Sequence, residues 1–388
     1  MNIVVIGHID AGKSTTIGRL LYDSKSIPES KMSEIQKLVD SYKRKFEFGY
    51  FLDAMQEELE EERTIDTTRV TFTAGKNLHT VVDVPGHKEF IKNMLTGACN
   101  ADAAILIVDV LKGVEEQTRR HAYLTKMLGI TQGIVCINKM DQVNYEPLPF
   151  EEALDEVDKL LKDLELNNFS IMPISALNGD NIYSISKNMD WWTDLTLIET
   201  LDLLEEAHKK PQPLRIMVQG IYKGVTLARL LTNGTISEER IVFLPSGNKV
   251  TMDPIPAFKG ECLELKPRDH SIELRGDIGG VEGQIKSSIF IKGEVVILED
   301  TLKVKDNLRL RCGTAEVDCT ILNISDILDP GTGKSLSNKK IIKSNQAGIV
   351  NFSTKPIVVE RFSDIPELGR FLLIKNGKQI GLGIVLET

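Results

Sequence analysis

A glycine-rich segment near the start of the chain has the residue types and spacing of a phosphate-binding loop. Gly7 and Gly12 enclose four residues and are followed by Lys13 and Ser14, which gives the pattern G-x-x-x-x-G-K-[ST]. Glycine allows backbone angles that a Cβ atom forbids, so successive N–H groups can turn toward an anion. Lys13 would supply a cation to the β and γ phosphates, and the Ser14 hydroxyl would ligate Mg²⁺. The residues predicted to contact the phosphates are Gly7, His8, Asp10, Ala11, Gly12, Lys13, Ser14 and Thr15.

The neighbouring residues provide the context that this motif requires. Residues 1–6 form an apolar, β-branched run that is typical of a buried strand, and residues 15–22 have helical spacing. The N-terminus of that helix would point at the bound phosphates. The alternative is a plain glycine turn between a strand and a helix, and the motifs farther along the chain argue against it.

A threonine upstream of the second motif is the candidate sensor of the γ-phosphate. Residues 57–62 are mostly glutamate and could form a solvated helical face. Thr64 follows them, and we predict that it contacts the γ-phosphate and Mg²⁺ from a mobile segment.

The second motif is a D-x-x-G at the end of a predicted strand, residues 78–84, which forms a hairpin with residues 69–74. Asp83 would hold Mg²⁺ through water, and the Gly86 N–H would turn toward the γ-phosphate and swing away when it leaves. His87 could be a plain loop histidine, but its position directly after the motif favours orientation of the attacking water. The predicted catalytic residues are His87, Thr64, Gly86 and Lys13.

The third motif, N-K-x-D, predicts the base. Asp141 can accept both the N1–H and the N2–H of guanine, whereas adenine would leave that carboxylate unpaired. Asn138 would brace the loop, and the stem of Lys139 would lie on the base. A backbone N–H of a later segment, residues 175–177, could donate to guanine O6. The predicted guanine-binding residues are Asn138, Lys139, Asp141, Ser175, Ala176 and Leu177, and the predicted metal ligands are Ser14, Thr64 and Asp83.

The order of these motifs predicts the fold of the first half. Apolar runs at residues 101–110, 133–137 and 169–174 read as buried parallel strands. Helical patterns cover residues 115–128, 150–166 and 195–207. Each motif then lies at a strand end, which predicts a doubly wound α/β domain that binds GTP or GDP with Mg²⁺ off the carboxyl ends of its strands.

The second half of the chain, which follows a short linker at residues 209–213, has a different residue pattern. Short β-rich runs, residues 357–361 among them, recur between glycine, proline and asparagine. This pattern predicts two small all-β barrels, with a boundary near residues 276–280. The predicted domains are a GTP-binding domain at 1–208 and β-barrels at 211–281 and 282–388.

The composition of the 388 residues excludes several classes of protein. A net charge of −9 argues against a nucleic-acid surface, which usually needs a basic face. Five cysteines without a C-x-x-C pair indicate free thiols in a reducing cytoplasm. No apolar run approaches the ~18 residues of a membrane span, and the first residues read as a strand rather than a signal peptide.

Taken together, the motifs resemble those of the elongation factor Tu and elongation factor 1-alpha superfamily along essentially the whole chain. The signatures are residues 7–15, residues 83–87 and residues 138–141. Within that group the chain is most similar to the large, GTPase subunit of bacterial heterodimeric sulfate adenylyltransferase. That likeness is carried by residues 113–121, 243–247 and 308–314, and by Arg120, where elongation factors usually have an acidic residue.

This resemblance implies that GTP hydrolysis is coupled to formation of adenylyl sulfate from ATP and sulfate. The implied partner is the small catalytic subunit of sulfate adenylyltransferase, with neither a membrane nor a nucleic acid involved. Two alternatives remain: a GTPase that delivers aminoacyl-tRNA in translation, and a GTP-binding regulatory module with little turnover.

Two departures from the family pattern bear on activity. Glu62 and Arg63 occupy places that normally hold glycine and an apolar residue, which reduces backbone freedom beside the nucleotide. The first barrel is also trimmed at residues 222–226 and 268–276. We therefore expect GTP binding with slower hydrolysis, and the trimmed barrel further disfavours a tRNA role.

Overall fold

The chain forms two compact units, Met1–His208 and Lys209–Thr388. The computed structural model describes residues 1–27, 48, 68–74, 77–83, 101–204, 212–223, 225–236, 240–251, 255–265, 275–332, 334–336 and 340–388. None of the helices within these ranges is both long and apolar enough to cross a membrane.

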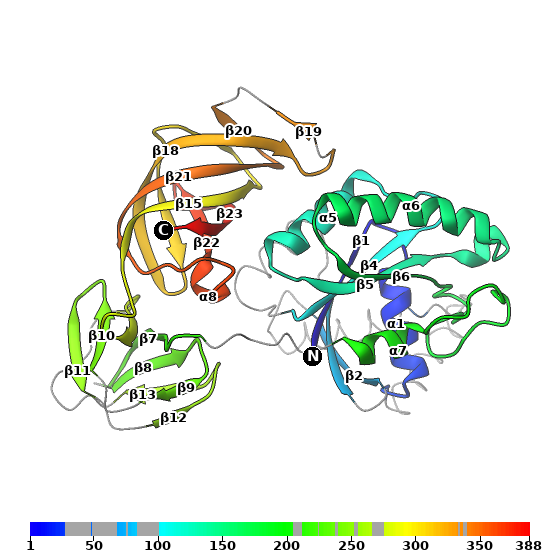
Figure 1. Ribbon diagram of the computed structural model, residues 1–388, viewed down its shortest axis with the longest axis horizontal. Coiled ribbons are helices and arrows are strands. Elements are labelled where there is room, and N and C mark those ends of the chain that lie inside the picture. The colour runs from blue at the N-terminus through cyan, green and yellow to red at the C-terminus, as the bar shows by residue number, and fades with distance from the viewer. Residues whose placement is uncertain are drawn as a thin grey trace, which may run out of the picture. The chain divides into compact units, whose positions relative to one another are not determined.

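The first unit is built on one six-stranded sheet (Figure 1). Its strands are β1 (Asn2–Gly7), β2 (Thr68–Ala74), β3 (Asn77–Asp83), β4 (Ala103–Asp109), β5 (Gln132–Asn138) and β6 (Asn168–Pro173). Their order is β2-β3-β1-β4-β5-β6, and all neighbours run parallel except β2, which is antiparallel to β3. From β1 the sheet continues through β3 to β2 on one side and through β4 and β5 to β6 on the other, so the strand order reverses at β1. In sheets of this kind, ligands bind outside the carboxyl ends of the strands at such a reversal.

Helices cover both faces of this sheet. They are α1 (Lys13–Asp23), α5 (Glu116–Met127), α6 (Pro147–Asp163) and α7 (Leu197–Leu203), with a short 3₁₀ helix, η1 (Met140–Val143). In Figure 1, α5 and α6 lie on one face and α1 and α7 on the other. All seven residues of β4 are buried, which is the burial that a strand covered on both faces requires. The prediction of a doubly wound α/β domain is therefore confirmed.

The first barrel of the second unit consists of short antiparallel strands. They are β7 (Ile216–Tyr222), β8 (Val225–Leu230), β9 (Gly234–Ile236), β10 (Arg240–Leu244), β11 (Asn248–Thr251), β12 (Ile255–Ala257), β13 (Cys262–Leu265) and β14 (Ile278–Val281). Six of them form a sheet in the order β11-β10-β14-β7-β8-β13, and β9 pairs with β12. Tyr222 pairs with Val225, so only two residues separate β7 from β8.

Residues 278–280 of the expected boundary segment belong to β14, which ends at Val281, the last residue of the predicted first barrel. This strand pairs with both β10 and β7 inside the first barrel. A Cβ atom on Gly279 would lie 2.6 Å from the Phe243 ring, and one on Gly280 would lie 3.1 Å from the Arg215 guanidinium. These glycines therefore serve close packing within the barrel, and the next strand begins only at Ser288.

The second barrel has longer strands. They are β15 (Ser288–Ile297), β16 (Thr301–Lys303), β17 (Asn307–Cys312), β18 (Ala315–Asp329), β19 (Lys334–Ser335), β20 (Ile341–Lys343), β21 (Gln346–Ile357), β22 (Arg370–Lys375) and β23 (Lys378–Glu387), with one helical turn, α8 (Pro366–Gly369). The sheet order is β17-β22-β23-β15-β21-β18-β19, and pairing of β17 with β18 closes the barrel. The predicted pair of all-β barrels is thus confirmed, but a strand over residues 357–361 is wrong. Val358 and Val359 are apolar because they pack in the core beyond the end of β21.

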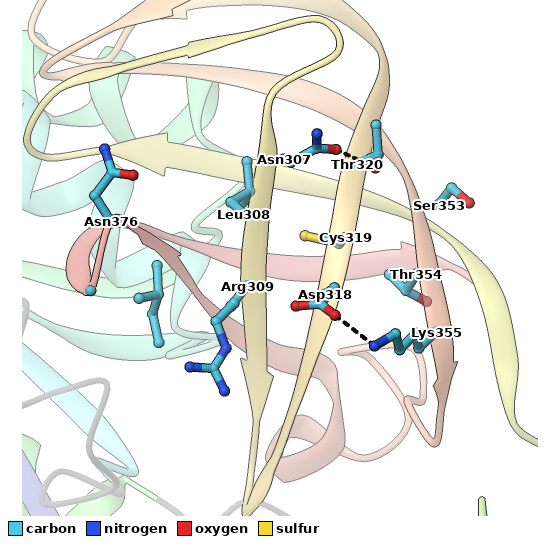
Figure 2. Close-up of a pocket in the computed structure, with 12 residues that line it drawn as sticks. Asn307, Leu308, Arg309, Asp318, Cys319, Thr320, Ser353, Thr354, Lys355 and Asn376 are labelled. Carbon is cyan, nitrogen blue, oxygen red and sulfur yellow. Dashed lines mark hydrogen bonds and ion pairs between the residues drawn. The ribbon is translucent and has the colours of Figure 1, made fainter.

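A depression of about 640 Å³ lies on the second barrel, over β17, β18, β21 and β22 (Figure 2). Two pairs of its polar side chains meet across the strands. Asp318 forms an ion pair with Lys355 at 2.7 Å, and the Thr320 hydroxyl donates to the Asn307 side-chain oxygen at 2.7 Å. These contacts tie neighbouring strands together, as cross-strand pairs do.

Candidate nucleotide-binding site

The glycine loop connects β1 to α1 and has space only for glycine at both ends. Gly12 caps α1 in the left-handed region, at φ 97° and ψ 27°. A Cβ atom there would lie 2.3 Å from the Asn138 side-chain nitrogen, and one on Gly7 would lie 2.4 Å from the Ile107 carbonyl oxygen. The loop backbone is therefore packed directly against β4 and the end of β5, and the first turn of α1 follows it.

The predicted phosphate-binding side chains are gathered around this loop. The Lys13 ammonium donates to the carbonyl oxygens of Gly7 at 3.1 Å and His8 at 2.8 Å, so it lies over the loop. Ser14 and Thr15 follow it in the first turn of α1, and the Ser14 side chain is exposed. An exposed hydroxyl beside a lysine at a helix N-terminus fits the donor set for a Mg²⁺–phosphate group.

The middle of the loop is more open to solvent than its ends. His8 is about one-third exposed; its Nδ1 lies 2.7 Å from the Ile9 carbonyl oxygen and 3.4 Å from Glu115. Asp10 is exposed with φ 63°, whereas Ala11 is buried. Left-handed backbone at Asp10 and Gly12 alternates the direction of successive peptide groups, as anion-binding loops require.

Asn138, the last residue of β5, joins the phosphate loop to the segment predicted to read guanine. Its side-chain N–H donates to the Ala11 carbonyl oxygen at 2.8 Å. Its side-chain oxygen accepts from the Ala176 backbone N–H at 2.9 Å. Asn138 is almost fully buried, so these bonds replace water that the amide would otherwise bind. A contact from the Ala176 N–H to guanine O6 would have to be shared with Asn138.

The remaining guanine-binding candidates lie at the same edge of the sheet. The Ser175 hydroxyl donates to an Asp141 carboxylate oxygen at 2.6 Å, which orients that carboxylate. Lys139 has φ 69°, and its ammonium pairs with Asp109 at 2.8 Å. Leu177 is exposed beside Ala176. These residues come together because parallel strands β4, β5 and β6 end at one edge.

Three further residues contact the predicted nucleotide-binding residues and were not themselves predicted from the sequence. Asp109 ends β4 and is nearly fully buried against Lys139. His121, on the buried face of α5, accepts a hydrogen bond from the Gly7 N–H at 3.3 Å. Arg19, on α1, donates to the Leu177 carbonyl oxygen at 3.4 Å. A carboxylate at the end of an apolar strand was a usable signal, but the other two contacts depend on tertiary packing.

The structure describes only one of the residues predicted to respond to the γ-phosphate and Mg²⁺ from the segments after α1. Thr64, Gly86 and His87 lie outside the described residues. Asp83 is the last residue of β3, which runs parallel to β1 with Val4 opposite Val82. Its backbone therefore reaches the edge where the glycine loop begins.

A glycine loop on a helix N-terminus, a lysine over it and an asparagine joining it to an aspartate-bearing loop define a P-loop protein of the GTPase class. Comparison with known proteins agrees. The chain matches the family "Elongation factor Tu GTP binding domain" over residues 1–210 and "GTP-eEF1A C-terminal domain-like" over residues 291–386.

Curated relatives match along the full chain. The elongation factor 1-alpha of Aeropyrum pernix is 37% identical over 425 positions, which cover 100% of this chain and 96% of the relative. Those of Archaeoglobus fulgidus and Pyrococcus furiosus are 36% and 37% identical and are covered to 97%. A solved structure of Sup35 complexed with GMPPNP aligns at 22% identity and a TM-score of 0.43, covering 99% of this chain and 93% of that one. The chain therefore belongs to the elongation factor Tu and elongation factor 1-alpha family of GTPases.

Proposed function

We propose that this protein is a GTP-hydrolysing switch of the translation-factor type that carries aminoacyl-tRNA in the cytoplasm. The observation that supports nucleotide binding best is the pair of hydrogen bonds through which Asn138 joins the phosphate loop to the segment proposed to bind guanine. The relatives named elongation factor 1-alpha support the role in translation.

The side chains around the loop have distinct tasks in this proposal. Lys13 exchanges its carbonyl partners for phosphate oxygens, and the α1 N-terminus adds N–H donors to the same charge. Asp141, oriented by Ser175, accepts the two N–H groups of guanine. Ser14, Thr64 and Asp83 are the proposed ligands of Mg²⁺, which when bound would neutralise charge on the phosphates. Thr64 and His87 keep their proposed roles in sensing the γ-phosphate and orienting water.

Replacement of one residue tests guanine recognition. We expect calorimetry with Mg²⁺ to show a strong preference of the wild-type chain for GTP over ATP. Asp141→Asn should lower GTP affinity by about 10²-fold and raise affinity for xanthosine triphosphate, because an amide can donate to the carbonyl that replaces the 2-amino group. Asp155→Asn, on the exposed side of α6, is the matched control and should change neither. Equal affinity of the wild type for GTP and ATP would refute the proposal.

A second candidate is the GTPase subunit of sulfate adenylyltransferase. The presence of Arg120 favours it, together with a net charge of −9 that gives no support to RNA binding. In the structure Arg120 forms an ion pair with Glu116 on the same helix, α5.

Two purified systems distinguish the candidates. If the GTP-loaded chain protects the ester of aminoacyl-tRNA from hydrolysis and the GDP-loaded chain does not, the translation role is supported. If instead a sulfate adenylyltransferase small subunit binds the chain and forms adenylyl sulfate only with GTP, the second role is supported. Absence of GTP turnover in both systems would point to a regulatory module.

A further inference from the structure

Tyr145 lies four residues beyond Asp141 and is tied to the far side of the guanine-reading segment. We propose that Tyr145 is a positioning residue for guanine recognition, acting through Asn178, and that it sets part of the preference for guanine over other bases. This rests on the GTP binding proposed above. The residue does not touch the nucleotide in this proposal; it holds the segment that does.

The backbone at Tyr145 is held in an unfavourable conformation. Asn144 and Tyr145 both have positive φ, at 51° and 61°. Asparagine tolerates this region, but a bulky aromatic residue rarely adopts it unless its surroundings hold it there. Here the Tyr145 N–H donates to the Met140 carbonyl oxygen at 2.9 Å, and the Trp191 indole N–H donates to the Tyr145 carbonyl oxygen at 2.9 Å. Both backbone groups of Tyr145 are therefore anchored, and its side chain has a defined direction.

The Tyr145 hydroxyl reaches the loop that follows β6. The Asn178 side-chain N–H donates to the Tyr145 hydroxyl oxygen at 2.8 Å. Asn178 directly follows Leu177 in the predicted guanine-binding segment, and its backbone N–H donates to the Ser175 hydroxyl at 3.3 Å. The hydroxyl thus contacts the segment on the side away from Asn138.

Three hydrogen bonds now join residues 138–145 to this loop, and the bond of Tyr145 is the last along both segments. Asn138 bonds to Ala176, Asp141 to Ser175, and Tyr145 to Asn178. The backbone N–H groups of Ala176 and Leu177 are the candidate donors to guanine O6, and they lie between Ser175 and Asn178. Removal of the outer bond would free one end of this short stretch, while the inner two bonds remain.

The surroundings of Tyr145 raise the pKa of its hydroxyl. Burial raises the pKa of the Tyr145 phenol, and the nearby Asp180 and Asp141 carboxylates raise it further, against the lowering effect of the Asn178 hydrogen bond. A neutral phenol accepts from Asn178 and still has a proton to donate. Asp180 is itself fixed by the Ser186 hydroxyl at 2.6 Å and by Asn188 at 3.2 Å. The tyrosine is thus surrounded by groups that favour one orientation of its hydroxyl.

The test is Tyr145→Phe, which removes one oxygen atom and keeps the ring. Affinities of the full chain for GTP and ATP with Mg²⁺ are measured by calorimetry and competition. GTP affinity should fall about five- to tenfold, the effect of one hydrogen bond, while ATP affinity stays unchanged. The GTP/ATP ratio should therefore fall by the same factor, a change that a merely structural role would not produce. Tyr183→Phe, at an exposed tyrosine in the same region, is the matched control and should leave the ratio unchanged.

A double-mutant cycle shows whether the effect runs through Asn178. Asn178→Ala should lower the GTP/ATP ratio by a similar factor, and the double variant should lose no more than either single variant. A Tyr145→Phe chain with wild-type GTP/ATP preference would overturn this proposal alone, as would fully additive losses in the cycle or equal losses of GTP and ATP. A wild-type chain without preference for GTP would instead overturn the proposed function, and this proposal with it.

Discussion

The two units of this protein use polar side chains in different ways. In the first unit the central strands β1, β4 and β5 are buried on both faces, and polar groups accumulate where strands end: Asp109, Asn138 and Ser175 lie after or at the ends of β4, β5 and β6. In the second unit β17 alternates exposed and buried residues along its length. Polar side chains of the neighbouring strands pair across the sheet, as Figure 2 shows for Asp318 of β18 and Lys355 of β21. A parallel sheet thus concentrates chemistry at one edge, whereas a barrel spreads polar contacts over its surface.

The largest expected effect tests whether polar contacts in the second unit serve stability alone. Arg215 is nearly fully buried, and its guanidinium donates to Glu360 at 2.6 Å and 2.8 Å and to the Gln284 carbonyl oxygen at 2.7 Å. Arg215→Ala should lower the free energy of unfolding by about 3–5 kcal/mol, because Glu360 would keep a partly buried, unpaired charge. Denaturant unfolding measures this loss, and GTP affinity of the folded variant should not change.

The matched control for Arg215 is an exposed ion pair in the same unit. Lys249 pairs with Glu282, and both side chains are more than 40% exposed. Lys249→Ala should cost less than about 1 kcal/mol. A comparable loss in the two variants, or loss of GTP binding in Arg215→Ala, would contradict the division between the units.

A pair of glycine substitutions places the same strain in both units. Gly12 and Gly247 both have positive φ, at 97° and 81°, but only Gly12 has no space for a Cβ atom; at Gly247 nothing lies within 4 Å. Gly12→Ala should weaken GTP binding by about 10²-fold, because strain adds to displacement of Asn138. Gly247→Ala should cost about 1–2 kcal/mol of stability and leave GTP binding intact. Unchanged GTP affinity in Gly12→Ala would show that the glycine loop is not the site.

The smallest expected effect concerns His79, a buried histidine of β3 that stacks on Phe72. Burial lowers its pKa below 6.5, the nearby N-terminal ammonium lowers it further, and Asp202, 3.9 Å away, opposes the shift. Below pH 6.5 the unfolded chain therefore binds more protons than the folded chain, so stability falls as the pH falls.

His79→Leu should flatten this pH dependence. The wild-type slope between pH 5 and 7 should exceed that of the variant by up to about 1.4 kcal/mol per pH unit, the limit for one proton. Denaturant unfolding at several pH values provides the measurement. Equal slopes in the two proteins would show that another group controls acid stability.

Much of the fold of the first unit was predictable from the sequence, because there the local residue pattern of each segment agrees with its place in the tertiary structure. Four motifs were each expected at a strand end, and the strands at residues 2–7, 77–83, 132–138 and 168–173 end at or within two residues of where these motifs begin. The barrels were predictable as a class but less so in detail. Gly279 and Gly280 were placed at the boundary between the barrels, because the reason for these glycines, which is room for Phe243 and Arg215, is absent from the local sequence.

The amino-acid sequence by itself determined the phosphate-loop motif, the aspartate predicted to bind guanine and the order of the domains, because each depends on residue type and short spacing. Tertiary structure alone decided which residues support them. His121, on α5, and Tyr145, in the segment after η1, reach the site through hydrogen bonds to residues 114 and 33 positions away. Spacing along a chain carries no record of such contacts, because they exist only once the strands have aligned.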